Sequence, residues 1–289
     1  MNNEIKGLAP SLTRGHFLNV IYAILTAVAI VFLSYAGTDI PMAAALFYMA
    51  TGSSIIFNFV EASRFKSSHL AVFRYWQSWL VMSIAFILNW VFSYYSATHS
   101  APEFYVSVFF LTSAGCASLA ARDGWKAIAC MLAASSAYIL TQASIAALMS
   151  TVLAGISIFT YFVISRNLAM RANLSANSII AVRCYLMTLG TFGYLLIHDE
   201  LAHLAIPAVQ VPSLLILVFF NMVIPSFLSQ TCLHYLGIAR FTQINSFIPV
   251  LVFVFQTIFL SEWNIPLLLT CILATVALNS QNFIKTPPR

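Results

Sequence analysis

The chain has 289 residues, of which 61% are hydrophobic and only 7% are charged, with a formal net charge of +5. Soluble domains carry about 25% charged residues, so this composition excludes a water-soluble fold. Apolar runs of about 20 residues recur from end to end, and each could cross a hydrocarbon core about 30 Å thick as a helix. The composition predicts an all-α, polytopic membrane protein.

Ten apolar segments follow one another along the chain. The first, 16–36, follows Lys6 and Arg14 as a signal peptide would, but it lacks a clear small-x-small cleavage site. We therefore expect it to be retained as a helix. The other nine segments are expected at about 41–61, 73–95, 103–121, 125–142, 148–166, 176–197, 212–236, 242–260 and 264–282.

Lysine and arginine fall on one side of this segmentation. They lie before the first segment, around the loops that follow the second, fourth, sixth and eighth, and at the end of the chain. Cytoplasmic loops are enriched in Lys and Arg, so this sorting predicts ten transmembrane helices with the tails 1–15 and 285–289 in the cytoplasm. The basic residues serve topology and indicate no nucleic-acid partner. The opposite loops contain no Lys or Arg, and they carry these acidic residues: Asp39, Glu103, Asp199, Glu200 and Glu262.

Ten helices divide into five plus five. An odd number of helices in each half makes the second half enter the membrane in the opposite sense, which predicts an inverted repeat. When the third segment is laid over the eighth, Asn89 pairs with Ser229 and Trp90 pairs with Gln230. The two halves share a pattern and little identity.

The end of the chain carries three signals in a fixed order. A helix closes on the stretch 234–240, an apolar segment containing Pro249 follows, and a Ser261-Glu262 turn precedes the last segment. This order resembles the end of the EamA repeat of the drug/metabolite transporter superfamily.

The resemblance extends over two repeats, about 16–145 and 148–284, and is better in the second. Ser175 followed eight residues later by Arg183 looks like the family's arginine early in the second helix of a repeat. The resemblance implies a transporter of small organic metabolites, in which the solute reaches a central cavity between the two halves.

Polar and aromatic side chains are densest in the third and eighth segments. Amide and indole groups can hydrogen-bond a polar solute while aromatic faces bury its apolar part. The alternative is that the aromatic residues form interfacial belts and that the amides join helices. We predict these solute-binding residues: Asn89, Trp90, Tyr94, Asn221 and Gln230.

Arg183 is the only cation set inside an apolar run. Its planar fork of donors would suit a carboxylate or a phosphate. The alternative is a side chain that snorkels to the cytoplasmic headgroups. Pro225 and Pro249 would each free a backbone carbonyl in mid-helix, which predicts gating positions or static bends.

These features favour a secondary transporter in the inner (cytoplasmic) membrane, acting as a monomer or homodimer. We expect it to export a small polar metabolite, such as an amino acid, by alternating access. No Asp or Glu lies near the middle of a segment, which argues against an antiporter that uses a membrane-embedded carboxylate. The runner-up is an importer or exchanger of an anionic or cofactor-like metabolite, such as S-adenosylmethionine, with Arg183 as the anchor.

An enzyme is the alternative from another class. The outer stretch Asp199-Glu200-x-x-His203, beside His198, could bind a metal by its spacing, but no second cluster accompanies it. A catalytic site needs acids, bases or metal ligands gathered at one place. We therefore expect no enzymatic activity, no metal and no cofactor.

Overall fold

The computed structural model describes residues 2–261 and 263–279, apart from the side chains of 2–11, 234, 238, 239, 242 and 243. All regular structure in these ranges is helical, and seven helices are long and apolar enough to cross a membrane. The chain is therefore an all-helical, polytopic membrane protein. The predictions that concern Glu262 and the tail 285–289 lie outside the described residues.

The first half of the chain forms six α-helices and one turn of 3-10 helix. The first helix begins well before the apolar segment that predicted it. The elements are α1 (Asn2–Ala36), α2 (Met42–Val60), η1 (Ala62–Arg64), α3 (Phe65–Arg74), α4 (Trp76–His99), α5 (Pro102–Ala120) and α6 (Gly124–Thr141).

The second half contains several interrupted helices. The predicted segment 176–197 is two helices that meet at Cys184, and the predicted segment 212–236 passes through a π-helix. The elements are α7 (Ile145–Ala172), α8 (Ala176–Arg183), α9 (Tyr185–Ile197), η2 (Leu201–Leu204), η3 (Ala208–Gln210), α10 (Val211–Ile216), the π-helix η4 (Leu217–Val223), α11 (Ile224–Asn245), α12 (Ile248–Leu260) and α13 (Ile265–Asn279).

Local capping sets several of the helix ends. Asp123, Ser144 and Ser175 precede α6, α7 and α8, and each side chain accepts a hydrogen bond from a backbone N–H three residues on. Such caps satisfy donors that the first helical turn leaves free. Gln142 and Asn173 end α6 and α7 in the left-handed conformation. The connections between these helices are consequently short.

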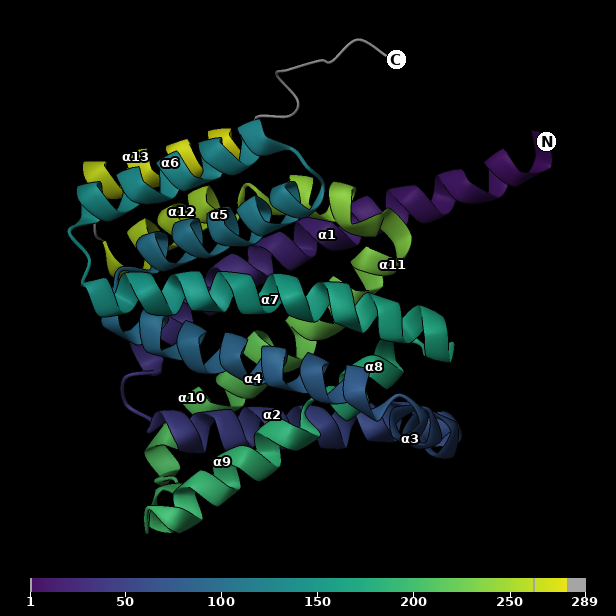
Figure 1. Cartoon of the computed structure of the whole chain (residues 1–289). Coiled ribbons are helices and arrows are strands. Elements are labelled where there is room, and N and C mark those ends of the chain that lie inside the picture. The colour runs from purple at the N-terminus through teal and green to yellow at the C-terminus, as the bar shows by residue number, and fades with distance from the viewer. Residues whose placement is uncertain (1, 262, 280–289) are drawn as a thin grey trace.

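The helices form a bundle in which α4 packs against α7 and α1 against α11 (Figure 1). Side chains join both pairs: Ser96 hydrogen-bonds Thr151 between α4 and α7, and Asn19 Nδ2 donates to the carbonyl oxygen of Phe241 at 3.0 Å. At one end of the bundle α6 lies beside α13, and at the other end α2 lies beside α9.

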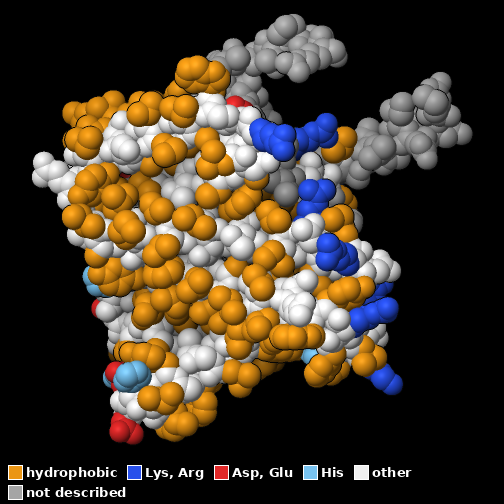
Figure 2. All heavy atoms as spheres, viewed as in Figure 1, with side chains coloured by type: hydrophobic (Ala, Val, Ile, Leu, Met, Phe, Trp, Pro, Cys, Tyr) orange, Lys and Arg blue, Asp and Glu red, His pale blue; other side chains and the backbone are white. Residues whose placement is uncertain are grey.

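The surface has the character of a membrane protein. Large apolar side chains are exposed along most of the helices, and they cover much of the face seen in Figure 2. Lysine and arginine side chains gather along one edge of that face, on the side where α7 ends. An apolar surface bounded by a basic edge fits a protein that lies across a bilayer.

The prediction that Pro249 lies in mid-helix is wrong. Helix α12 begins at Ile248, so Pro249 lies in its first turn. The N–H groups of a first turn have no intrahelical partner, so proline is tolerated there and frees no carbonyl. The chain instead turns at Ser246 and Phe247, between α11 and α12.

Helix α3 has no counterpart among the predicted segments. It is a short helix between α2 and α4, and it ends one residue before Tyr75, where the backbone leaves the helical conformation (φ −116°, ψ 37°). Its ten residues include Lys66, His69 and Arg74, so it shows no long apolar run. The prediction that a membrane helix starts at residue 73 therefore crosses this break.

Candidate functional site

A cavity of about 820 Å³ lies inside the bundle. Its walls come from α1, α4, α5, α7, α8, the π-helix and α11, with α6 and α13 contributing at its edge. Sites for small molecules commonly enclose about 300–1,000 Å³. The cavity is therefore large enough for a metabolite.

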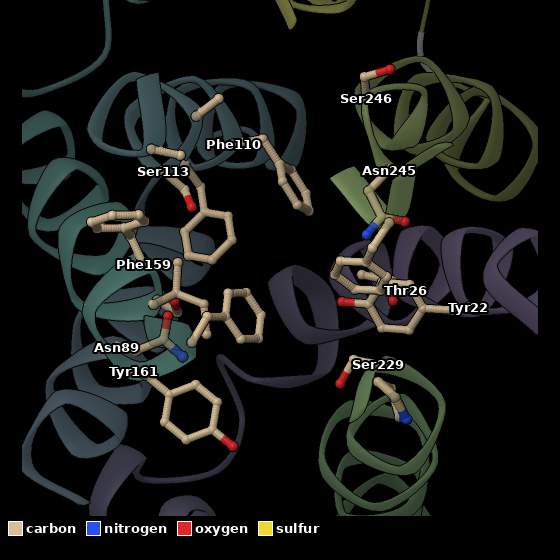
Figure 3. A pocket seen from close by; sticks show the side chains of 18 of the residues that line it. Tyr22, Thr26, Asn89, Phe110, Ser113, Phe159, Tyr161, Ser229, Asn245 and Ser246 are labelled. Carbon is tan, nitrogen blue, oxygen red and sulfur yellow. The ribbon is translucent and has the colours of Figure 1, made fainter. Parts of the chain in front are cut away.

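Two facing sides of the cavity each contain one helix from each half of the chain. Figure 3 shows Asn89 of α4 beside Tyr161 of α7, and it shows Tyr22 and Thr26 of α1 on the other side, near Ser229 of α11. The side chains that face one another here are amides, hydroxyls and aromatic rings. They can hydrogen-bond a polar solute and cover an apolar one.

Aromatic rings form much of the wall. Phe86 and Trp90 stand nearly perpendicular, with ring centres 6.3 Å apart, and Phe86 lies 5.3 Å from the ring of Tyr161. Aromatic side chains present broad apolar faces at low conformational cost, which suits the body of an organic molecule. The aromatic residues that line the cavity besides Tyr161 are Tyr22, Phe86, Trp90, Tyr105, Phe109, Phe110, Phe159, Phe162 and Phe241.

Arg183 lies at the end of α8 and is only 2% exposed. Its Nη1 donates to the Tyr161 hydroxyl at 2.7 Å, and its Nη2 donates to the Ser226 hydroxyl. The guanidinium carbon lies 4.2 Å from the centre of the Phe86 ring, a cation–π contact. A snorkelling side chain would reach the surface, so that interpretation of Arg183 is wrong.

No carboxylate balances this charge within the described part of the chain. None of the described residues that line the cavity is Asp or Glu, and no carboxylate oxygen of a described residue lies within 4 Å of Arg183. Burying an uncompensated charge in a membrane protein costs at least a few kcal/mol. The guanidinium is held here by neutral hydroxyls and an aromatic face.

Three further cations line the cavity where it reaches the surface. Arg166 and Arg240 are exposed, and Lys126 is half-buried. These positions belong to the loops and helix ends that carry basic residues in the sequence. The cavity therefore opens on the basic edge of the molecule, and Arg183 lies at its buried end.

Some buried polar atoms on the cavity wall have no hydrogen-bond partner among the described residues. They include the donor Nδ2 of Asn221, the donor Nε of Arg183 and the acceptor Oδ1 of Asn89. Both asparagines are less than 9% exposed. Buried polar groups are normally satisfied, so these atoms are the places where a bound molecule would make hydrogen bonds.

Pro225 also lines the cavity, as the second residue of α11. It directly follows the π-helix that contains Asn221, and it has no N–H to offer the preceding turn. Single π-helical turns inside longer helices occur often at functional sites. The irregular part of this long helix therefore lies against the cavity.

The structure brings together most of the predicted site residues. Asn89, Trp90, Asn221, Arg183 and Pro225 all line the cavity.

Two predicted residues lie elsewhere. Gln230 lies outside the lining and donates from Nε2 to the hydroxyl of Tyr161 at 3.0 Å, so it supports a lining residue. The hydroxyl of Tyr94 donates to the carbonyl oxygens of Gly37 and Ile40, at 2.7 and 3.0 Å, in the connection between α1 and α2. Tyr94 is therefore a structural residue.

Tyr161, Ser226 and the aromatic residues of α5 belong to the lining and were missed as site residues. A tyrosine or serine in an apolar run is too common to be singled out by its type.

The outer acidic stretch brings one histidine close to one carboxylate. His203 Nδ1 lies 3.6 Å from Glu200 Oε2, and both side chains are exposed. Among the side chains that the structure describes, no group of three or more His, Cys, Asp or Glu could hold a metal ion.

Comparison with known proteins identifies the fold and nothing finer. No family model and no curated protein matches the chain. Solved structures do match: one protein of known crystal structure superimposes with a TM-score of 0.63, over 95% of this chain and 97% of its own length. The two sequences are 11% identical, so the likeness shows a shared fold. The chain thus adopts, over nearly its whole length, a helical fold already known from a crystal structure.

Proposed function

We propose that the chain is a secondary transporter that carries a small polar metabolite across the cytoplasmic membrane by alternating access. In this proposal it has ten transmembrane helices arranged as two inverted five-helix repeats, with both termini in the cytoplasm. The solute binds in the cavity, and the two repeats rock about it.

The pattern of helix contacts supports an inverted repeat. Let α1 correspond to α7, α2 to α8 and α9 together, α4 to the long helix ending in α11, α5 to α12, and α6 to α13. The contact of α4 with α7 then corresponds to the contact of α11 with α1. In the same way, the contact of α5 with α6 corresponds to that of α12 with α13, and the contact of α5 with α7 corresponds to that of α12 with α1. The pairs α2 with α9 and α6 with α13 map onto themselves. These contacts are all present, as a two-fold relation predicts, whereas the contacts of α5 with α13 and of α1 with α4 lack counterparts of similar extent.

The observation that carries the proposal is the cavity itself. It lies where α4 and α7 face α1 and α11, and it opens on the basic edge. A basic edge faces the cytoplasm by the positive-inside rule. The structure would then correspond to a state that is open to the cytoplasm, which is one end of an alternating-access cycle.

The direction of transport is proposed as export, on the resemblance to the EamA repeat. Import or exchange of an anionic metabolite is the second candidate. One observation favours it: Arg183 offers a buried positive charge to the solute without a described carboxylate partner.

The test is metabolite profiling of cells and medium after the gene is deleted and then restored. Accumulation of one compound inside the deletion strain, and its return to the medium on restoration, would establish export. Loss of a compound that normal cells draw from the medium would establish uptake. Identical profiles in all strains, under conditions in which the gene is expressed, would contradict the proposal.

Restoration with matched variants links the flux to the cavity. We expect Trp90→Ala and Asn221→Ala to lose most of the flux, because both side chains line the cavity. Trp125→Ala and Asn167→Ala serve as controls, since these residues are exposed and lie outside the cavity. Membrane insertion of each variant is measured by quantitative blotting.

A further inference from the structure

Hydrogen-bond donors converge at the buried end of the cavity. Arg183 contacts the hydroxyls of both Tyr161 and Ser226, which ties α8 to α7 and α11. Asn221 lies on the same continuous helix as Ser226, a little more than one turn earlier, and lines the same cavity. Arg183, Tyr161 and Ser226 are therefore in direct contact, and Asn221 adds a donor to the same cavity from the preceding turn of the helix that carries Ser226.

The hydroxyl hydrogen of Tyr161 takes no part in the two hydrogen bonds that its oxygen accepts. Its oxygen accepts from Arg183 Nη1 and also from Gln230 Nε2. A phenol oxygen that receives two donors directs its own hydrogen at a third group, which must be an acceptor. In Figure 3 this hydroxyl points away from α7, at the end of the ring that is farther from Asn89.

No negatively charged acceptor faces these donors in the described lining of the cavity. Asn221 Nδ2 and Arg183 Nε have no hydrogen-bond partner among the described residues, and the described lining contains no carboxylate. Each unsatisfied buried donor carries a desolvation cost, and the guanidinium adds the cost of its charge. One anionic group would offset both costs.

The charge and shape of the site select among anions. A single guanidinium lies at the buried end, and the other three cations lie toward the basic edge. One guanidinium neutralises one negative charge, and its planar fork matches the two oxygens of a carboxylate. A phosphate dianion would leave a second charge unbalanced among aromatic rings.

We infer that the solute is an aromatic or similarly flat organic monocarboxylate. Its carboxylate binds beside Arg183, Tyr161 and Asn221, and its apolar body lies against the aromatic wall that includes Phe86 and Trp90. This inference rests on the proposed function in taking the cavity as the solute site. It goes beyond that function by naming the chemical class of the solute and the group that recognises its charge.

The experiment is calorimetric titration of the purified full-length protein in lipid nanodiscs with three probes of similar shape. The probes are 3-phenylpropanoate, its neutral amide 3-phenylpropanamide, and phenyl phosphate. We expect 3-phenylpropanoate to bind at least about tenfold more tightly than either of the others, a ratio that corresponds to the loss of one charge-assisted contact.

Matched variants assign the preference to the site. Arg183→Lys keeps the charge and loses the fork, so we expect affinity for 3-phenylpropanoate to fall about tenfold or more. Tyr161→Phe removes one donor and should weaken the carboxylate while leaving the amide unchanged. Arg171→Lys is the control, because Arg171 is an exposed arginine of α7 outside the cavity. Thermal unfolding shows whether each variant is folded. If Arg183→Lys does not fold, Tyr161→Phe tests the inference alone.

The outcomes separate this inference from the proposed function. Failure of 3-phenylpropanoate to bind, equal affinity for acid and amide, or unchanged affinity in both Arg183→Lys and Tyr161→Phe would overturn the inference. Anion binding with no change of any metabolite on gene deletion would overturn the transporter and leave the anion site standing. Transport of a solute without a carboxylate would overturn the inference about the solute and leave the transporter standing.

Discussion

Two polar residues on α4 have different roles although they lie five positions apart. Asn89 lines the cavity, whereas Tyr94 is buried and holds the connection between α1 and α2. The two carbonyl oxygens that Tyr94 contacts belong to Gly37 and Ile40, residues that end one helix and precede the next. Tyr94 thus fixes how the first two helices join.

Removal of this hydroxyl should destabilise the fold and spare the site. We expect Tyr94→Phe to lower the free energy of unfolding by about 1–3 kcal/mol, because two buried carbonyls lose a donor. Thermal unfolding in detergent measures the change. Tyr35→Phe is the matched control, since Tyr35 lies near the same connection and is 68% exposed. If Tyr94→Phe lost solute binding and kept its stability, Tyr94 would be a solute-binding residue and not a structural one.

The sequence predicted the chemistry of the site better than its geometry. Asn89, Trp90, Asn221 and Arg183 could be selected because amides, indoles and cations are costly in apolar runs unless they face a cavity. Tyr94 and Tyr161 could not be told apart in this way, since each lies in an apolar run. Which tyrosine faces the cavity depends on the rotation of its helix, and that is set by contacts with other helices.

At the scale of the elements, the approach of α7 to α5 depends on one glycine. A Cβ atom at Gly155 would lie 2.7 Å from Cβ of Thr112 and 2.9 Å from the carbonyl oxygen of Phe109. Real Cβ atoms do not come so close, and the carbonyl is part of a helix backbone that cannot move alone. Phe109 lines the cavity, so this contact also positions the aromatic wall.

A methyl group at this position should force the two helices apart. We expect Gly155→Ala to lower the free energy of unfolding by about 1–3 kcal/mol, the usual cost of overpacking. Gly190→Ala is the control: its Cβ would meet nothing within 4 Å. That change should be neutral or slightly stabilising, because alanine favours helix by up to about 1 kcal/mol. Equal unfolding temperatures for the two variants would contradict the close approach.

Periodicity and composition located the helical segments but not the irregular places within them. Pro249 was expected inside a helix and lies at the start of one, while Pro225 was expected to interrupt a helix and follows a π-helix that its own type does not predict. A proline has the same missing N–H in both settings. Only the hydrogen bonds of its neighbours decide whether a helix begins or bends there, and these depend on the tertiary structure.

At the scale of the whole molecule, the distribution of charge sets the orientation in the membrane. Exposed cations such as Arg171 lie on the basic edge, and Glu200 and His203 lie at the connection after α9. The ends of a spanning helix must lie on opposite sides of the bilayer. The two groups of loops should therefore be reached by reagents from opposite compartments.

Cysteine labelling in whole cells measures this orientation. In a background without the five native cysteines, we expect Ala202→Cys to react with a membrane-impermeant maleimide in intact cells. Ser67→Cys should react only in inverted vesicles, because it lies in α3 among Arg64, Lys66 and Arg74. Both positions are exposed, so access depends on the compartment alone. Labelling of both from the same side would contradict the predicted topology.

The four donors at the buried end of the cavity all come from the second half of the chain, whereas six of the nine other aromatic lining residues come from the first. Under the proposed function, the two halves therefore contribute different parts of selectivity. Substitutions in the first half can change which molecular shapes are accepted without altering the preference for charge. Related transporters could therefore change the solutes that they accept through substitutions in the first repeat alone, while the second repeat keeps the residues that select the charge.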